Sequence, residues 1–283
     1  MRRALLCWIA LWVAGPALAD AIRLEGVFTQ GGILRGVVEP GTQLSLDGEA
    51  VSVSSTGQFV IGFGRDAAPS AHLQAVLPNG LQIGQEIRIQ PRQYDIQRVT
   101  GVPESTVNPP AALIARIDQE AALVAKAREQ ETALTDFSEP FRWPLMGPVT
   151  GVFGSQRVYN GVPKSPHYGV DVAAPVGTIV VAPAGGVVTL VHDDMFYSGG
   201  TLIIDHGHGL TSTFIHLNRV LVRNGQRVEQ GDEIAEVGDK GRASGPHLDW
   251  RMNWRDRRVD PVTLVGPMPA NNATTQTGTG DAD

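Results

Sequence analysis

Residues 199–217, with the sequence GGTLIIDHGHGLTSTFIHL, decide the fold class. They hold two runs rich in apolar and β-branched residues, and the glycines of the DHGHG segment between them are typical of a tight turn between strands. Runs of the same kind, again interrupted by glycine, stand on both sides as GTIVVAPAGGVVTLV (177–191) and GQRVEQGDEIAEVG (225–238). We therefore expect an antiparallel β-sheet domain over residues 141–265.

The N-terminal part, residues 20–100, repeats this pattern on a smaller scale. In QLSLDGEAVSV (43–53), Leu44 and Leu46 alternate with polar residues, an Asp-Gly pair provides a turn, and the alternation then resumes. The pattern predicts a β-sandwich-like N-terminal domain. No motif in it indicates chemistry, so we expect a binding or spacer role.

A helix is expected between the two parts, over residues 108–136. Asn108 can cap it, Pro109 suits its first position, and the strong helix formers AKAREQE follow. Four apolar residues fall on one helical face: Leu113, Ile117, Ala121 and Val124. The segment predicts a linker helix between two β domains, and so a mainly β protein.

The first nineteen residues have the form of a cleaved secretory signal. Two arginines precede an apolar run, and Ala17-Leu18-Ala19 matches a signal peptidase site. The run is shorter than the about 20 apolar residues that a membrane span needs. We expect export across the inner membrane to the periplasm without stable membrane insertion. At the other end, residues 267–283 have no large apolar side chain after Met268 and are expected to be a disordered tail.

Composition excludes several classes of function. The single cysteine, Cys7, lies in the predicted signal, so the mature chain has neither a disulfide scaffold nor a thiol nucleophile. The net charge is −6, and the chain has no run of lysine or arginine. Nucleic acid and anionic membrane surfaces are therefore not expected as partners.

Histidines cluster in one part of the chain, since six of the seven lie between positions 167 and 247. Without cysteine, a metal site of imidazole and carboxylate groups is the chemistry to test. His167 and Asp171 stand four apart where a turn leads into a strand. His247 and Asp249 stand two apart on a strand, so both side chains can point into one cavity.

The other histidines carry weaker signals. Strand alternation predicts that His216, in STFIHL, shares a face with Phe214 and lies opposite Ile215. A lone histidine beside apolar residues is more often structural than catalytic. His206 and His208 match a His-x-His pattern, but two glycines place them in a turn, where we expect solvated side chains.

Taken in order, five motifs resemble the catalytic domain of lysostaphin-type (LytM-like) zinc endopeptidases over about residues 141–263. They are HYGVD, APVGTIVVAPAGGVV, GHGLTSTFIHL, NGQRVEQGDEIAEVG and GRASGPHLD. The resemblance implies that His167 and Asp171 are zinc ligands and that His216 and His247 are the two catalytic imidazoles. Phe214 stands where the family has tyrosine. The implied fold is a compact antiparallel β-sheet with the site in a groove.

Asp249 is the main departure, because it stands where this family has a histidine as the third zinc ligand. Either the ligand was lost, or aspartate replaces it. Nδ1 of histidine and each Oδ of aspartate lie two bonds from Cβ, so aspartate can reach the same ion if the family's histidine binds through Nδ1. Zinc accepts carboxylate oxygen at about 2.0–2.2 Å. We therefore expect His167, Asp171 and Asp249 to hold one Zn²⁺.

The exchange has chemical consequences. One histidine with two aspartates cancels both charges of Zn²⁺, so a bound water would be less acidified and the enzyme slower, with a more alkaline optimum. Mn²⁺ is expected to compete for this oxygen-richer site.

Family resemblance implies a function: a secreted metalloendopeptidase, a peptidoglycan hydrolase that cuts peptide stems or cross-links of bacterial cell walls. Two alternatives stay open. The domain could be an inactive activator of a cell-wall amidase, or a module that only binds peptidoglycan.

Overall fold

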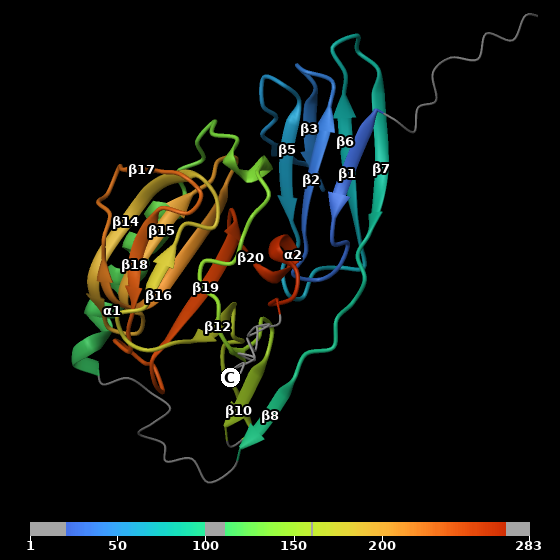
Figure 1. Ribbon diagram of the computed structural model, residues 1–283. Coiled ribbons are helices and arrows are strands. Elements are labelled where there is room, and N and C mark those ends of the chain that lie inside the picture. The colour runs from blue at the N-terminus through green and yellow to red at the C-terminus, as the bar shows by residue number, and fades with distance from the viewer. Residues whose placement is uncertain (1–20, 100–110, 160, 270–283) are drawn as a thin grey trace, which may run out of the picture.

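The computed structural model describes residues 21–99, 111–159 and 161–269. The mainly β fold class is confirmed, since nearly every element in these ranges is a strand (Figure 1). The predicted signal at residues 1–19, the predicted start of the helix at 108–110 and all but the first residues of the predicted tail lie outside the described residues.

Two small antiparallel sheets form the N-terminal part. One has the order β1-β2-β5 and the other the order β4-β3-β6-β7. Their bounds are β1 Ile22–Gly26, β2 Ile33–Val38, β3 Gln43–Leu46, β4 Glu49–Val51, β5 Gln58–Gly62, β6 Ser70–Val76 and β7 Gln82–Arg88. The expected alternation holds, because Leu44 and Leu46 are buried while Gln43 is exposed.

The C-terminal part is built on a ten-stranded sheet with the order β17-β14-β15-β16-β19-β12-β9, to which β13, β18 and β20 add at the side. The bounds are β9 Val149–Gly151, β12 Gly169–Ala173, β13 Ile179–Val181, β14 Gly186–Met195, β15 Gly199–Asp205, β16 Leu210–Val220, β17 Arg227–Val228, β18 Glu233–Val237, β19 His247–Trp254 and β20 Arg257–Val259. The glycine-rich DHGHG segment forms the predicted turn between β15 and β16.

One face of this sheet packs into the hydrophobic core. On β19, Leu248, Trp250 and Met252 are fully buried, which leaves Asp249, Arg251 and Asn253 on the opposite face. Trp250 packs edge-on against Trp143, and its indole N–H donates to Ser212. This alternation fixes the register of β19 and aims its polar residues at one side of the sheet.

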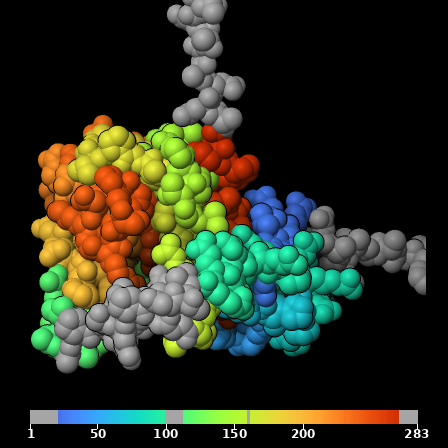
Figure 2. Space-filling view, turned by 90° about the horizontal axis from the view of Figure 1, so that it is seen from below, coloured from blue at the N-terminus to red at the C-terminus, as the bar shows by residue number. Residues whose placement is uncertain are grey.

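The two parts share contacts along their length. Buried side chains of both belong to a single hydrophobic cluster. The strand β8 (Ile96–Val99) leaves the N-terminal part and pairs in parallel with β10 (Gln156–Tyr159), which also pairs with β11 (Val162–Pro163). Figure 2 shows the teal residues of this region lying on the yellow-green residues of the C-terminal part. Arg92 and Asp260 add an ion pair of 2.7 Å.

Helix α1 (Ala111–Arg128) ends earlier than the predicted residue 136. The physical reason is tertiary: the Thr132 hydroxyl donates to Asp205, and the Thr132 carbonyl accepts from the His208 N–H, which draws the chain out of a helical path. Only a short 3-10 turn, Asp136–Ser138, follows. The helix lies on the C-terminal sheet against β14 and β15. Among the described residues no helix is long and apolar enough to cross a membrane. The short helix α2 (Val262–Val265) closes the described chain.

Candidate metal centre

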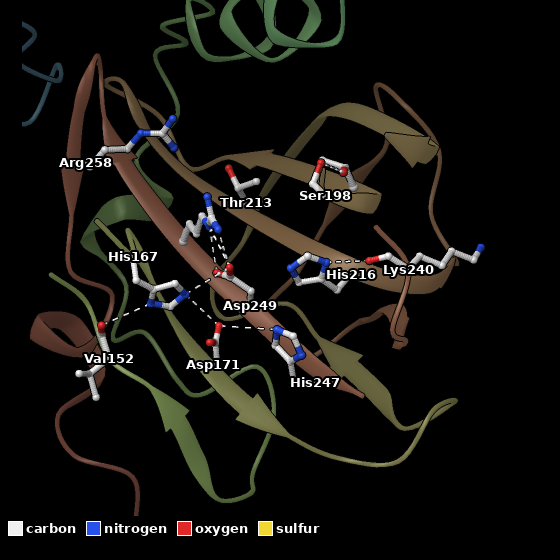
Figure 3. A network of polar contacts seen from close by, with 12 residues as sticks. Val152, His167, Asp171, Ser198, Thr213, His216, Lys240, His247, Asp249 and Arg258 are labelled. Atoms are coloured by element: carbon white, nitrogen blue, oxygen red, sulfur yellow. Dashed lines mark hydrogen bonds and ion pairs between the residues drawn. The ribbon is translucent and has the colours of Figure 1, made fainter. Parts of the chain in front are cut away.

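Strands β12 and β19 bring two aspartates together. They pair antiparallel, and in their register Asp171 stands directly opposite Asp249. Residues opposite each other in a ladder share a face, so the two carboxylates lie side by side. His167 lies in the irregular segment just before β12, and its side chain points toward both aspartates (Figure 3). The structure thus brings together the three predicted metal ligands, of which Asp249 stands far from the other two in the sequence.

Distances in this cluster suit one small cation. Nε2 of His167 lies 3.0 Å from Oδ1 of Asp171 and 3.3 Å from Oδ2 of Asp249. One ligand atom from each residue can be chosen so that all lie within 4.8 Å of one another. Four ligands at the zinc distance of about 2.1 Å stand about 3.4 Å apart in a tetrahedron. Oδ1 of Asp171 is buried and, apart from its ion pair with His167, has no hydrogen-bond partner in the described part of the chain, so it is open to a metal ion.

The three imidazoles at the centre are oriented in the same way. Nδ1 of His167 faces the carbonyl of Val152 at 3.3 Å, Nδ1 of His216 that of Lys240 at 2.8 Å, and Nδ1 of His247 that of Gly245 at 2.7 Å. An N–H donated to each carbonyl fixes the orientation of the ring and leaves Nε2 of each ring facing away from that carbonyl. A metal ion bound at Nε2 of His167 would take the place of the proton there, and Nε2 of His216 and Nε2 of His247 are available for proton transfer.

His216 reaches the site only because β16 is irregular. Ile215 stands opposite Asp249 and so occupies the site face, whereas Phe214, opposite Trp250, is in the core. Regular alternation would send His216 to the core face with Phe214, as the sequence predicted. That prediction is wrong: His216 has a φ of 63°, a left-handed conformation rare outside glycine, and its ring lies 4.8 Å from that of His247. Such local strain is typical of functional sites.

Arg251 is a further site residue that was not predicted from the sequence. It stands two residues after Asp249 on the same face of β19, and its Nε and one terminal nitrogen donate to the Asp249 carboxylate at 2.6–3.1 Å. Its positive charge offsets the negative charge of one of the two aspartates, so the predicted ligands together with Arg251 have the net charge that a histidine in place of Asp249 would give. The sequence did contain an indication, because an arginine two residues after a proposed carboxylate ligand on a strand lies on the same face as that ligand.

Two glycines make room for this arrangement. Gly169 on β12 stands opposite Arg251, and a Cβ there would lie 2.4 Å from Oδ1 of Asp249 and 2.7 Å from Cγ of Arg251. Gly151 on β9 stands opposite Asp171, and a Cβ there would lie 2.1 Å from Oδ2 of Asp171. The absence of a side chain at both positions lets the carboxylates lie flat against the neighbouring strands.

Burial and the neighbouring charges shift the pKa values of Asp249 and His167 in opposite directions. Burial raises the pKa of Asp249, but the charge of Arg251 and the contact with His167 outweigh burial and hold that pKa well below its usual range. Burial lowers the pKa of His167, but the contacts and charges of Asp171 and Asp249 raise it to about 10. Burial lowers the pKa of His216, so its ring stays neutral at pH 7.

His206 and His208 lie away from this cluster, but the expected solvation is wrong. His206 is fully buried, with Nδ1 2.6 Å from the Gly185 carbonyl and Nε2 2.8 Å from the Ser212 hydroxyl. His208 packs against Phe137. The turn is buried because residues 132–137 cross it, with Phe137 N–H donating to the His206 carbonyl. Both histidines are structural.

Comparison with known proteins agrees with the resemblance of the motifs. Residues 165–261 match the profile of Peptidase family M23. Peptidoglycan DD-endopeptidase ShyA of Vibrio cholerae serotype O1 is 32% identical over 124 residues, or 44% of this chain and 29% of that protein. DD-carboxypeptidase/endopeptidase Mpg of Neisseria meningitidis serogroup B is 37% identical over 103 residues, or 36% of this chain and 24% of that protein. The chain thus spans less than a third of the length of these curated relatives.

The likeness to one solved structure extends further along the chain. A crystal structure of a Pseudomonas aeruginosa protein assigned to peptidase M23 is 28% identical, with a TM-score of 0.64. The similarity covers 84% of this chain and 95% of that chain. It therefore includes more than the region that matches the family profile.

Proposed function

The chain carries a peptidase family M23 domain at residues 165–261, and on that premise we propose that it is a metal-dependent endopeptidase that cleaves peptidoglycan peptide stems or cross-links. One observation carries the proposal: three ligand atoms from His167, Asp171 and Asp249 converge on one point, with the free Nε2 atoms of two further imidazoles beside it. The curated relatives named as peptidoglycan DD-endopeptidases support the choice of substrate.

The donor set suits Zn²⁺. One imidazole nitrogen and two carboxylate oxygens are ligands that zinc accepts, and catalytic zinc sites keep three protein ligands and an open fourth position. When bound, the ion supplies a Lewis acid for the scissile carbonyl and lowers the pKa of a water molecule. Arg251 holds the Asp249 carboxylate in place through both of its oxygens. Mn²⁺ remains the expected competitor because two of the three ligands are oxygen.

The imidazoles of His216 and His247 have different roles in moving protons. His216 is neutral at pH 7 because burial lowers its pKa, and its Nε2 can accept the proton of the attacking water. Nε2 of His247 lies 3.9 Å from Oδ1 of Asp171, on the site face of β19. From there it can stabilise the developing oxyanion or protonate the leaving amine. The Lys240 and Gly245 carbonyls accept the Nδ1 N–H of the two rings, so the neutral His216 can take up a proton at Nε2, whereas His247 can stabilise the oxyanion or protonate the amine only when its Nε2 also carries a proton.

Metal analysis combined with muropeptide digestion tests this function. We expect about one divalent ion per chain, cleavage that stops on chelation, and recovery on adding Zn²⁺. Asp249→Ala should lose both the ion and turnover, whereas His216→Ala should keep the ion and lose turnover. A metal-free chain that leaves muropeptides intact but stimulates a cell-wall amidase would show the activator alternative instead, and cell-wall pull-down without cleavage would show the binding module.

We also propose that the chain is exported to the periplasm, where peptidoglycan lies. The apolar segment and the Ala-x-Ala site at residues 17–19 support this. Sequencing the N-terminus of the protein recovered from the periplasm should give Asp20 as its first residue. Recovery of uncleaved chain from the cytoplasm alone would contradict export.

A further inference from the structure

A group of arginines continues the site face beyond the metal centre. Arg251 stands opposite Thr213 of β16, and the Thr213 hydroxyl accepts a hydrogen bond of 3.0 Å from Arg128, near the end of α1. Arg258 on β20 pairs with Asn253 and donates to its side chain at 3.3 Å. Figure 3 shows Arg258 and Thr213 on the side of the sheet that carries Asp249. The three guanidinium groups thus lie near one another on this face, since the charges of Arg258 and Arg251 both act on Arg128.

Within the part of the chain that the structure describes, one of these three arginines has a carboxylate partner. Arg251 is paired with Asp249. Arg128 and Arg258 take part in no ion pair within residues 21–99, 111–159 and 161–269, and their hydrogen-bond acceptors are a neutral hydroxyl and a neutral amide. Nε of Arg128 is buried without any partner in the same ranges. The guanidinium of Arg258 also lies 5.6 Å above the Tyr168 ring, next in sequence to His167.

Burying the positive charges of Arg128 and Arg258 without a carboxylate partner costs free energy of folding. Burial lowers the pKa of Arg128 well below its usual value, and the charges of Arg258 and Arg251 lower it further. Burial, followed by the charge of Arg251, lowers the pKa of Arg258 to about 10. Buried charges in proteins are normally paired, and removing one partner from a pair is strongly destabilising. The group therefore has the composition of an anion site whose anion comes from outside the described chain.

We propose that Arg128 and Arg258 bind a carboxylate of the peptide substrate. This inference rests on the proposed function, because peptidoglycan peptides carry free carboxylates along their stems. Arginine suits the role, since its planar fork donates two parallel hydrogen bonds to a carboxylate. Helix α1 then does more than link two domains, because it supplies one of the two binding groups.

Strand geometry gives the spacing of the two sites. Residues two apart on a strand are separated by about 6.8 Å, so the arginine pair lies on the order of 7–14 Å from Asp249 along β19. An extended peptide covers about 3.3–3.6 Å per residue. The bound carboxylate therefore belongs about two to four residues from the bond that is cut. Binding of this carboxylate would determine which peptide bond of the stem lies at the metal centre.

Amidated and free substrates test the assignment. The wild-type chain should cleave a cross-linked muropeptide with free stem carboxylates with a kcat/KM about 10- to 100-fold above that for the same muropeptide with those carboxylates amidated. The double variant Arg128→Met/Arg258→Met should lose most of this preference while keeping its metal content. Arg223→Met is the matched control, because it removes an exposed arginine of the loop between β16 and β17. It should keep the full preference.

Direct binding separates this inference from the proposed function. The affinity of the zinc-loaded wild-type chain and of the double variant for both muropeptides is measured under conditions without turnover. Stronger binding of the free form by the wild type, lost in the double variant, supports the arginine site even if the wild type cleaves neither substrate, an outcome that would overturn the hydrolase proposal alone. An unchanged preference for the free carboxylate in the double variant, in cleavage or in binding, would overturn the arginine site.

Discussion

Asp249 shows how much a single substitution depends on its neighbour. Aspartate in place of a second histidine adds a negative charge to the ligand set, and on the sequence alone this change predicts a less acidified water. The structure places Arg251 on both oxygens of that carboxylate. Asp249 and Arg251 together have the net charge of a neutral histidine. A comparison with the histidine found at this position in other M23 domains must therefore include both residues.

Substitutions of Asp249 and Arg251 should have non-additive effects on the affinity for Zn²⁺. Arg251→Met should weaken Zn²⁺ binding about 10- to 100-fold, because outer-shell partners of metal ligands contribute on that scale. Asp249→His alone should also weaken it, since Arg251 would be left beside the ion without a carboxylate. The double variant Asp249→His/Arg251→Met should bind better than either single variant. Competition with a chromophoric chelator measures the affinities, and additive effects would show that the two residues act independently.

His206 gives the protein a predictable loss of stability in acid. Burial lowers its pKa from 6.5 to about 4, so the folded chain resists protonation while the unfolded chain accepts it. The stabilisation is complete above pH 6.5 and is lost as the pH falls toward 4, by about 2–3 kcal/mol. Urea titrations across this range measure it, with His206→Gln as the comparison. An equal pH dependence in the variant would exclude His206 as the cause.

At the scale of elements, the site depends on the register between β12 and β19. That register sets Asp171 opposite Asp249 and Gly169 opposite Arg251. A shift by one residue would turn the aspartates to the core face and the apolar residues of both strands to the surface. The bulge in β16 then adds His216, which regular pairing would direct away from the site.

Gly169→Ala tests this dependence with a single methyl group. The added Cβ would overlap Oδ1 of Asp249 and Cγ of Arg251, so the carboxylate must move away from its position opposite Asp171. We expect Zn²⁺ affinity to fall at least about tenfold, together with a loss of stability, because the added Cβ would also lie 2.7 Å from the Trp250 backbone carbonyl oxygen. Gly84→Ala on β7 is the control, because nothing lies within 4 Å of its added Cβ. Equal affinities in both variants would contradict the proposed crowding.

The whole molecule behaves as a single packed unit in its contacts. One hydrophobic cluster includes buried residues of the N-terminal sheets and of the large C-terminal sheet. A Cβ added at Gly62 of β5 would touch Trp254 and Val259, so the two parts approach closely. Asp260 adds a polar tie, because it pairs with Arg92 and also accepts the first backbone N–H of α2.

Removing this tie should destabilise both parts together. Asp260 is buried, so Asp260→Ala leaves the Arg92 guanidinium and the N–H of Val262 without their acceptor. We expect a loss of about 2–4 kcal/mol and a single unfolding transition at a lower temperature. Calorimetry measures it. Two separate transitions, of which only one moves, would show that the N-terminal and C-terminal parts unfold independently.

The sequence by itself determined the strands, their inward faces and the candidate ligands. Alternation of apolar residues is a local property, so it marks Leu248 and Trp250 as core and Asp249 as outward-facing without knowledge of the partner strands. The order of the motifs likewise indicated the M23 domain. The end of α1 was misplaced because contacts with the β15–β16 turn, far along the chain, decide it.

Only the tertiary structure decided which charged residues, and which residue of strained backbone, lie together at the proposed metal centre. The convergence of His167, Asp171 and Asp249 depends on strand register, and the approach of Arg128 depends on where a helix docks. The turn of His216 toward His247 depends on a left-handed residue within β16. Each joins residues far apart in the chain, and local periodicity holds no information about which distant segments pack together.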